Sequence, residues 1–148
     1  MPLLSITSEI VGRAVYNLNP LNGAPVERLP LFFILKEQNM SIDVKKIAQQ
    51  NDKFRKTFCG GQVLLTYGIS SLPMPQQFEI TQKVKESNNF TEDNDPYGEH
   101  DFGCFEYKGQ QIFWKIDLYD LNYEFYSPQP DDENQTNRTL TIMFAEEY

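Results

Sequence analysis

A dense group of ionisable side chains lies between positions 93 and 101 of the sequence. Five of them are candidate binding residues: Asp93, Asp95, Glu99, His100 and Asp101. Carboxylates are the hard oxygen ligands that Mg²⁺, Mn²⁺ and Ca²⁺ prefer. An EF-hand is excluded, because the twelfth position counted from Asp93 is Cys104 and not the bidentate glutamate that such a loop needs. A turn in which Asp and Asn bond their own backbone is the alternative, and we expect no metal and no cofactor.

His100, the single histidine of the chain, is the side chain best suited to acid–base chemistry near neutral pH. If Lys108–Gly109 forms a two-residue hairpin turn, Tyr107 faces Gln110, and the same register places His100 opposite Asp117. A carboxylate beside an imidazole fixes its tautomer and raises its basicity, so His100 and Asp117 are the candidate catalytic pair. A purely structural ion pair is the alternative. No nucleophile motif, phosphate-binding glycine loop or Cys–His pair accompanies them.

The elements that position these residues follow from the periodicity of the chain. Apolar residues at positions 44, 47, 54 and 58 predict a helix that begins after Ser41 and ends at Gly60-Gly61, with the polar Asn51 as a flaw in the apolar stripe. Residues 62–69 predict a strand, and Pro73 and Pro75 open a second predicted helix over residues 75–88. Later strands are expected over residues 101–108, 110–119, 121–126 and 138–145. This order predicts an α+β fold, with a mainly antiparallel sheet of about four to five strands and two helices packed on one face.

The first 39 residues differ from the rest of the chain, because they contain four of its nine prolines and show no sustained helical period. We expect an N-terminal extension over residues 1–39, followed by a single α+β domain over residues 40–148. Two alternatives stay open for the extension. Either Met40 is an internal start and this segment is an appendage, or residues 31–35 add a short buried strand.

Charge is distributed unevenly along the sequence. Residues 1–90 hold 10 Lys and Arg against 7 Asp and Glu, whereas residues 91–148 hold 3 against 14. The acidic half repels nucleic-acid phosphates, which argues against general nucleic-acid binding. Residues 97–126 also contain 10 aromatic residues, a composition that suits a protein partner with a basic surface. Solubility and core packing are the alternative explanations.

No segment predicts an association with a membrane. Residues 29–35 are apolar, but seven residues are far fewer than the ~20 that cross a bilayer. The start of the sequence lacks the basic and apolar regions of a signal peptide. Two cysteines and one histidine predict neither a disulfide framework nor a zinc site. We therefore expect a cytoplasmic protein with reduced thiols.

One stretch of the sequence resembles a known family. Residues 90–103, FTEDNDPYGEHDFG, resemble the signature of a bacterial family of domains of unknown function, numbered 3768. Further matching pieces are residues 51–55 (NDKFR), 60–61 (GG), 113–117 (FWKID) and 140–143 (LTIM), so the resemblance covers residues 41–148. It implies a small protein of plasmids and other mobile elements, and it implies no particular reaction.

Two functions agree with these observations. The first is a non-catalytic accessory factor of a bacterial mobile element, which binds or modulates a protein. The second is a small hydrolase or nuclease-like enzyme that depends on a divalent metal and uses His100 with nearby carboxylates. The scarcity of catalytic motifs favours binding over catalysis. Carboxylates that converge around an open pocket would favour the enzyme, and dispersed carboxylates would favour the binding protein.

Overall fold

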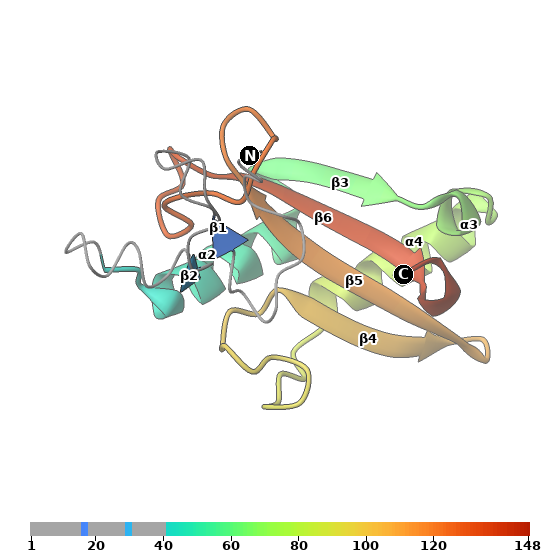
Figure 1. Cartoon of the computed structure of the whole chain (residues 1–148). Helices are drawn as coiled ribbons and strands as arrows, with labels where there is room; N and C mark the ends of the chain where they lie inside the picture. The colour runs from blue at the N-terminus through green and yellow to red at the C-terminus, as the bar shows by residue number, and fades with distance from the viewer. Residues whose placement is uncertain (1–15, 18–28, 31–40) are drawn as a thin grey trace. The chain divides into compact units, whose positions relative to one another are not determined.

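The computed structural model describes residues 16–17, 29–30 and 41–148. Strands β1 (Tyr16–Asn17) and β2 (Leu29–Pro30) form a short antiparallel pair (Figure 1). The chain divides into two compact units: Met1–Asp43 with Leu118–Asn137, and Val44–Asp117 with Arg138–Tyr148. We call the second the sheet unit. The strand considered for residues 31–35 lies outside the described residues, and the domain boundary at residue 40 stays a prediction.

Helix α2 (Val44–Thr57) opens the sheet unit and follows the predicted period. Its buried side is formed by five residues: Ile47, Ala48, Asn51, Phe54 and Arg55. Two of these are polar, although charged and amide side chains are rarely fully buried without partners. The helix ends at Thr57, because Phe58 adopts a left-handed φ of 57° directly after it.

The strand expected over residues 62–69 is shorter than predicted. Strand β3 covers Gly61–Leu65, and Tyr67–Ser70 form the short helix α3. The carboxylate of Glu147 holds this turn, since it accepts hydrogen bonds from Thr66 Oγ1 at 2.6 Å and from the Gly68 N–H at 2.8 Å. The bond from Thr66, with those from the backbone of Phe144 and Gly68, lowers the pKa of Glu147 despite the opposing effect of burial. A partner so distant in the sequence is invisible to a local pattern.

Strands β4 (Phe102–Tyr107) and β5 (Gln110–Tyr119) form the predicted hairpin. Their antiparallel register is the expected one, from Tyr107 opposite Gln110 to Phe102 opposite Lys115. Lys108 and Gly109 have φ angles of 50° and 80°, the left-handed values of a two-residue type I′ turn.

The strands of the described sheet unit follow the order β3-β6-β5-β4. Strand β6 (Asn137–Phe144) runs parallel to β3, with Val63 opposite Leu140, and Figure 1 shows it antiparallel to β5. The 3₁₀-helix η1 (Ala145–Glu147) follows it. The described part of the chain is therefore an α+β fold with a four-stranded, mostly antiparallel sheet, which confirms the predicted class.

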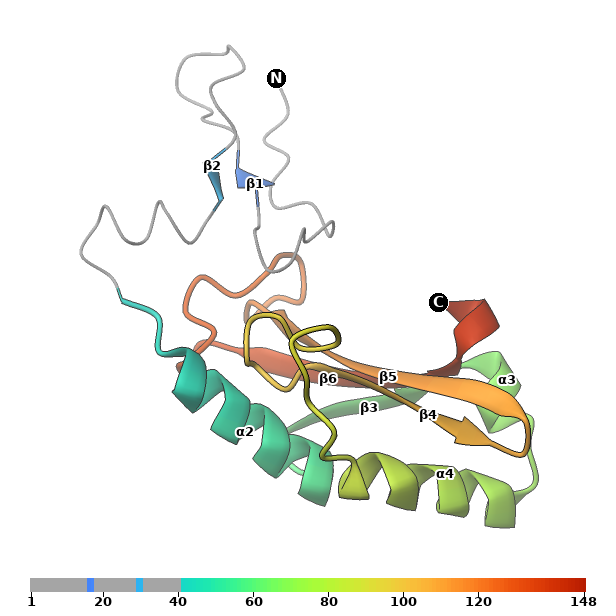
Figure 2. The same cartoon turned by 90° about the horizontal axis from the view of Figure 1, so that it is seen from below.

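Helix α4 (Met74–Glu86) begins directly after Pro73. Figure 2 shows α2 and α4 on the same side of the sheet, as predicted. Trp114 lies at the centre of this packed side and is fully buried. Its indole rests on Gly103, where an added Cβ atom would lie 2.5 Å from the ring. Among the described helices, none is long and apolar enough to cross a membrane.

The segment 118–137 belongs to the other compact unit and consists mainly of turns. The strand expected over residues 121–126 is wrong, since only an isolated bridge joins Tyr119 to Tyr126 within this described segment. The Asp120 carboxylate accepts the N–H groups of Asn122 at 3.1 Å and Glu124 at 3.0 Å. In a strand, these N–H groups would be available to a neighbouring strand. Because the Asp120 side chain binds them instead, it favours a turn.

Candidate functional site

The loop between α4 and β4 is organised by the carboxylate of Asp95, which is 7 % exposed. Its Oδ1 atom accepts the backbone N–H groups of Glu99 at 2.9 Å and His100 at 3.1 Å. These bonds hold His100 at a φ of 55°, in the left-handed region that a non-glycine residue rarely adopts. Asp95 therefore plays the turn-forming role that was the alternative to a ligand.

The ring of His100 lies between two carboxylates and against one aromatic ring. Its Nδ1 atom is 2.8 Å from Oδ2 of Asp52, and its Nε2 atom is 3.8 Å from Oδ2 of Asp95. Phe90 stacks on the imidazole, with ring centroids 3.9 Å apart and planes 3° from parallel. The side chain of His100 is 30 % exposed, so solvent reaches part of the ring.

The carboxylate partner of His100 is thus Asp52 on α2, and not the expected Asp117 on β5. The hairpin ladder ends at Phe102 and Lys115, before it reaches His100. The left-handed backbone of His100 then directs the chain away from an extended path. The carboxylate of Asp117 lies 3.1 Å from Nζ of Lys115 on the same strand.

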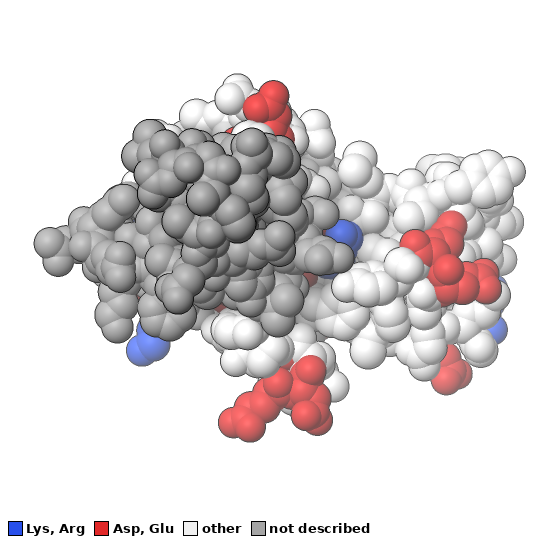
Figure 3. All heavy atoms as spheres, in the orientation of Figure 1, with Lys and Arg blue, Asp and Glu red and all other residues white. Residues whose placement is uncertain are grey.

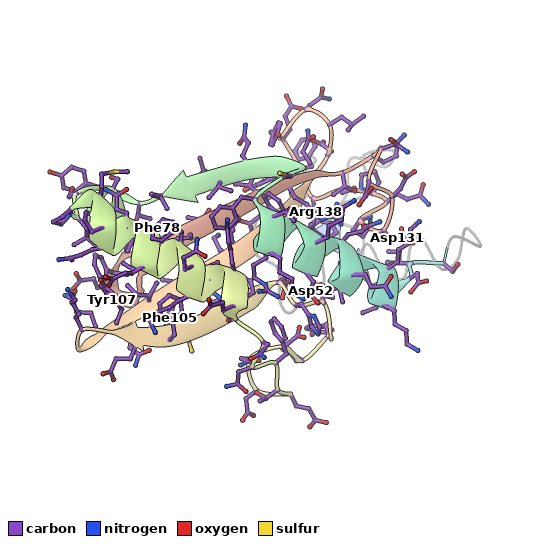
Figure 4. The ribbon with its side chains drawn as sticks, turned by 180° about the vertical axis from the view of Figure 1, so that it is seen from behind. Asp52, Phe78, Phe105, Tyr107, Asp131 and Arg138 are labelled. Atoms are coloured by element: carbon purple, nitrogen blue, oxygen red, sulfur yellow. The ribbon has the colours of Figure 1, made fainter. Side chains whose placement is uncertain are left out.

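Asp52 divides its carboxylate between two basic side chains. Its Oδ2 atom faces His100, and its Oδ1 atom accepts a hydrogen bond from Nη2 of Arg55 at 2.6 Å. Burial acts to raise the pKa of Asp52, but the hydrogen bonds and charges of His100 and Arg55 outweigh it and hold the pKa below its ordinary value. Figure 4 shows Asp52 on the side of α2 that faces the loop before β4.

Arg55 joins this site to the end of α4. Its Nη1 atom donates to the backbone carbonyls of Val84 at 3.1 Å and Lys85 at 2.9 Å. A cation is favoured there because the last carbonyls of a helix lack helical partners and form the negative end of its dipole. The guanidinium carbon also lies 5.5 Å from the ring centroid of Phe90 and 5.3 Å from that of Trp114.

Asn51, one of the two polar residues on the buried side of α2, is bonded through both the oxygen and the nitrogen of its amide. Nδ2 donates to the carbonyl of Glu99 at 2.9 Å, and Oδ1 accepts from Nε of Arg138 at 2.9 Å. Arg138 also donates to Gln50 Oε1 at 2.6 Å, and Figure 4 shows it beside α2. Asn51, Asp52 and Arg55 were not predicted as site residues from the sequence. The signal for Asn51 and Arg55 was a polar side chain on the buried side of a helix.

Glu99 is 3 % exposed. Burial, together with the negative charge of Asp101, raises the pKa of Glu99 to about 9. The side chain therefore keeps a proton at neutral pH, and it offers no carboxylate to a cation. Of the five expected binding residues, the structure brings His100 and Asp95 together, whereas Asp93 is exposed on the loop.

The arrangement can orient a histidine and exchange a proton at its ring. Within the described ranges, no group of three or more His, Cys, Asp and Glu side chains is arranged to hold a metal ion. The carboxylates of Asp52 and Asp95 instead bond groups of the protein itself. They fix the loop before β4 against α2.

A second candidate site lies on the outer face of the sheet, the face turned away from α2 and α4. Three aromatic side chains meet there: Phe102, Phe113 and Tyr148. Their ring centroids are 5.3 to 6.3 Å apart, and Tyr148 is 75 % exposed. On this face, Figure 3 shows carboxylates gathered around η1 and around the loop before β4. We call these three residues the aromatic cluster.

One family model matches residues 65–147, which is more than half of the 148-residue chain, and its description is protein of unknown function (DUF3768). The match includes the loop that carries His100 and strands β4 to β6, whereas α2 with Asp52 and Arg55 precedes it. No curated protein and no solved structure shows a significant similarity to the chain.

Proposed function

We propose a binding function for this chain, which belongs to DUF3768, a family described as proteins of unknown function. The chain binds a partner protein through the aromatic cluster on the outer face of its sheet, and it catalyses no reaction. Following the resemblance, we place this activity in an accessory factor of a bacterial mobile element.

The exposure of the aromatic cluster carries the proposal. Phe102 and Phe113 are half-buried, and Tyr148 places a large ring over them that remains 75 % exposed. Aromatic side chains are enriched at the centres of protein interfaces, because they bury much area at little entropic cost. Helices α2 and α4 cover the opposite side of the sheet, so within the sheet unit the outer face is the side that a partner would approach.

Charge indicates the kind of partner. Glu106 on β4 and Glu146 in η1 are exposed carboxylates on elements that adjoin the aromatic cluster. Lys115 lies on the same strand as Phe113, but its ammonium group is already paired with Asp117. A partner that presents Lys or Arg around an apolar centre would complement this arrangement, with carboxylates guiding the encounter.

The test compares variants of the full chain as bait in a bacterial lysate, followed by calorimetry with the purified protein that is retained. Tyr148→Ala removes the exposed ring, and Glu146→Lys reverses a charge beside it. Tyr97→Ala is the matched control, because Tyr97 is an exposed aromatic residue, at 50 %, in the loop before β4. We expect about tenfold weaker binding for each of the two test variants, or about 1.4 kcal/mol. Equal affinities for all four chains would refute the proposed surface.

A second candidate function is the metal-dependent hydrolase with His100 as its base. The 2.8 Å contact between His100 Nδ1 and Asp52 supports it, because a carboxylate in this position orients catalytic histidines. Addition of Mn²⁺ to the labelled protein tests it by NMR. A metal bound at this site would broaden the His100 resonances first, and the effect would disappear in Asp52→Asn. Uniform or absent broadening would eliminate this candidate.

A further inference from the structure

A long uncharged stretch forms one edge of the sheet unit. Residues 57–78 contain no Asp, Glu, Lys, Arg or His, in a chain whose net charge is −8. Four of their large apolar side chains are exposed: Leu64 at 48 %, Tyr67 at 86 %, Met74 at 73 % and Phe78 at 64 %. Figures 1 and 4 show where they come from, since β3, α3 and the start of α4 meet at the same end of the sheet.

Strand β3 is an edge strand of the described sheet, with β6 as its neighbour on one side. The N–H of Thr66 donates to the carbonyl of Ile142 on β6 at 3.1 Å. Because successive residues of a strand direct their backbone groups to opposite edges, Leu64 and Gln62 also face β6. The N–H and C=O groups of Gly61, Val63 and Leu65 therefore point away from the sheet.

Within the described residues, this edge lacks the sequence features that usually protect an edge strand from pairing. Natural edge strands are shielded by Lys, Pro, bulges or a covering element. Strand β3 contains no charged residue and no proline, and its five residues pair with β6 without a bulge. An uncharged edge with apolar neighbours is expected to have a partner.

We propose that the partner is a second copy of this chain, joined through the two β3 strands in an antiparallel pair. The distribution of charge favours a second copy as the partner. A basic partner is drawn to the acidic segments of the chain, whereas two copies of net charge −8 repel each other except where a neutral surface lets them approach. Strand β3 provides that surface, since it contains no charged residue, and the carboxylate of Glu147 bonds Thr66 and Gly68 beyond the end of this strand. It lies at the opposite end of the strand order from β4, which carries Phe102 of the aromatic cluster.

The strand is self-complementary in this arrangement. A two-fold axis through Val63 places Gly61 opposite the partner's Leu65 and Gln62 opposite the partner's Leu64. The outward-facing residues then form the hydrogen-bonded pairs of an antiparallel ladder, with Val63 opposite the partner's Val63. Gly61 faces the helix side, where an added Cβ atom would meet the ring of Phe54, so Leu64 lies on the outer face and packs across the axis.

Sedimentation velocity over a range of concentrations tests the association. We expect a reversible dimer for the parent chain and at least a tenfold weaker dimer for Leu64→Lys, which places two like charges near the axis. Val63→Pro removes an outward N–H and spares the bonds to β6, so it has the same expected effect. Leu121→Lys is the matched control, because Leu121 is exposed to a similar degree, at 54 %, and lies outside the uncharged stretch.

Disulfide trapping tests the register. In a background with Cys59→Ser and Cys104→Ser, which replace two exposed thiols, Val63→Cys should cross-link two copies under mild oxidation. Its Cα atoms would be about 5.5 Å apart, within reach of a disulfide. Gln62→Cys should not cross-link, because its Cα atoms would be about 7–8 Å apart. A monomeric parent chain, a dimer unaffected by Leu64→Lys, or cross-linking at 62 without 63 would each overturn the proposal.

Discussion

Asp52 and His100 are separated by 48 positions in the sequence, and their side chains meet with Oδ2 and Nδ1 2.8 Å apart. The contact joins α2 to the loop before β4, and the same carboxylate reaches Arg55, which holds the end of α4. One partly buried anion thus connects both helices with the loop that carries the chain's single histidine.

The first prediction concerns this carboxylate. Asp52→Asn should reduce the free energy of unfolding by about 1–3 kcal/mol, because buried Arg55 loses its anionic partner. Urea denaturation measures the change. Asp117→Asn is the matched control and should stay within about 1 kcal/mol of the parent, since Asp117 makes a solvent-accessible pair with Lys115. A larger loss for Asp117→Asn than for Asp52→Asn would contradict the site described here.

Acid should weaken the protein partly through Asp52. In the folded state, burial acts to raise the pKa of Asp52, but the hydrogen bonds and charges of His100 and Arg55 outweigh it and lower this pKa. The stabilisation is therefore present above the unfolded pKa and is lost as the pH falls through the folded one. We expect the difference in unfolding free energy between the parent and Asp52→Asn to shrink as the pH falls below about 4. A difference that stays constant down to pH 2 would argue against the ion pair.

Glu99 should make the protein less stable as the pH rises, the opposite of the effect of Asp52. Burial and the charge of Asp101 raise its pKa to about 9 in the folded state, from 4.5. Its contribution to stability is fully present below the unfolded pKa and is lost as the pH rises through the folded one, by at most about 1.4 kcal/mol per pH unit. In urea titrations between pH 5 and 9, the unfolding free energy of Glu99→Gln should fall less steeply with pH than that of the parent. The difference in slope should correspond to about one proton per molecule. Asp93→Asn, an exposed control in the same loop, should keep the alkaline loss that Glu99 causes.

The packing of Trp114 on Gly103 gives a further prediction. Gly103→Ala should destabilise the fold by about 1–3 kcal/mol, because its methyl group would overlap the indole ring. Removal of the ring itself, in Trp114→Ala, should cost about 3–5 kcal/mol. Fluorescence of the single tryptophan reports the unfolding of Gly103→Ala directly. Cys104→Ala, at the exposed neighbouring position, should change stability little. An equal loss of stability in Gly103→Ala and Cys104→Ala would mean that any substitution in this strand is destabilising, whatever its contact with Trp114.

The domain boundary remains open to a simple experiment. A chain that begins at Met40 should show a cooperative thermal transition, since the helices and strands of the sheet unit all follow that residue. Circular dichroism measures the melt. Loss of the transition would show that residues 1–39 belong to the folded core.

Local signals in the sequence were sufficient for parts of the fold. The turn at Lys108-Gly109 fixed the register of the β4–β5 hairpin, because a two-residue turn leaves one pairing. Apolar spacing located α2, and Pro73 and Pro75 located α4. These features depend on neighbours within a few positions.

The rest depends on distant residues. The strand prediction for 62–69 extended too far, because Glu147 holds Thr66 and Gly68 in a turn. The hairpin register predicted Asp117 as the partner of His100. The actual partner is Asp52 on α2, and the register of two strands carries no information about a helix that packs beside them. Asn51 looked like a flaw in an apolar stripe until its bonds to Glu99 and Arg138 were known.

The position of β6 has a consequence for the way the chain folds during synthesis. This strand is the last in the sequence, yet it lies inside the sheet, between β3 and β5. Its pairing with β3 joins Gly61 to Arg138 and Leu65 to Ile142, so the sheet cannot close until β6 has been synthesised, more than 70 residues after β3. Until then, β3 and β5 each present an unpaired edge at the place that β6 later fills.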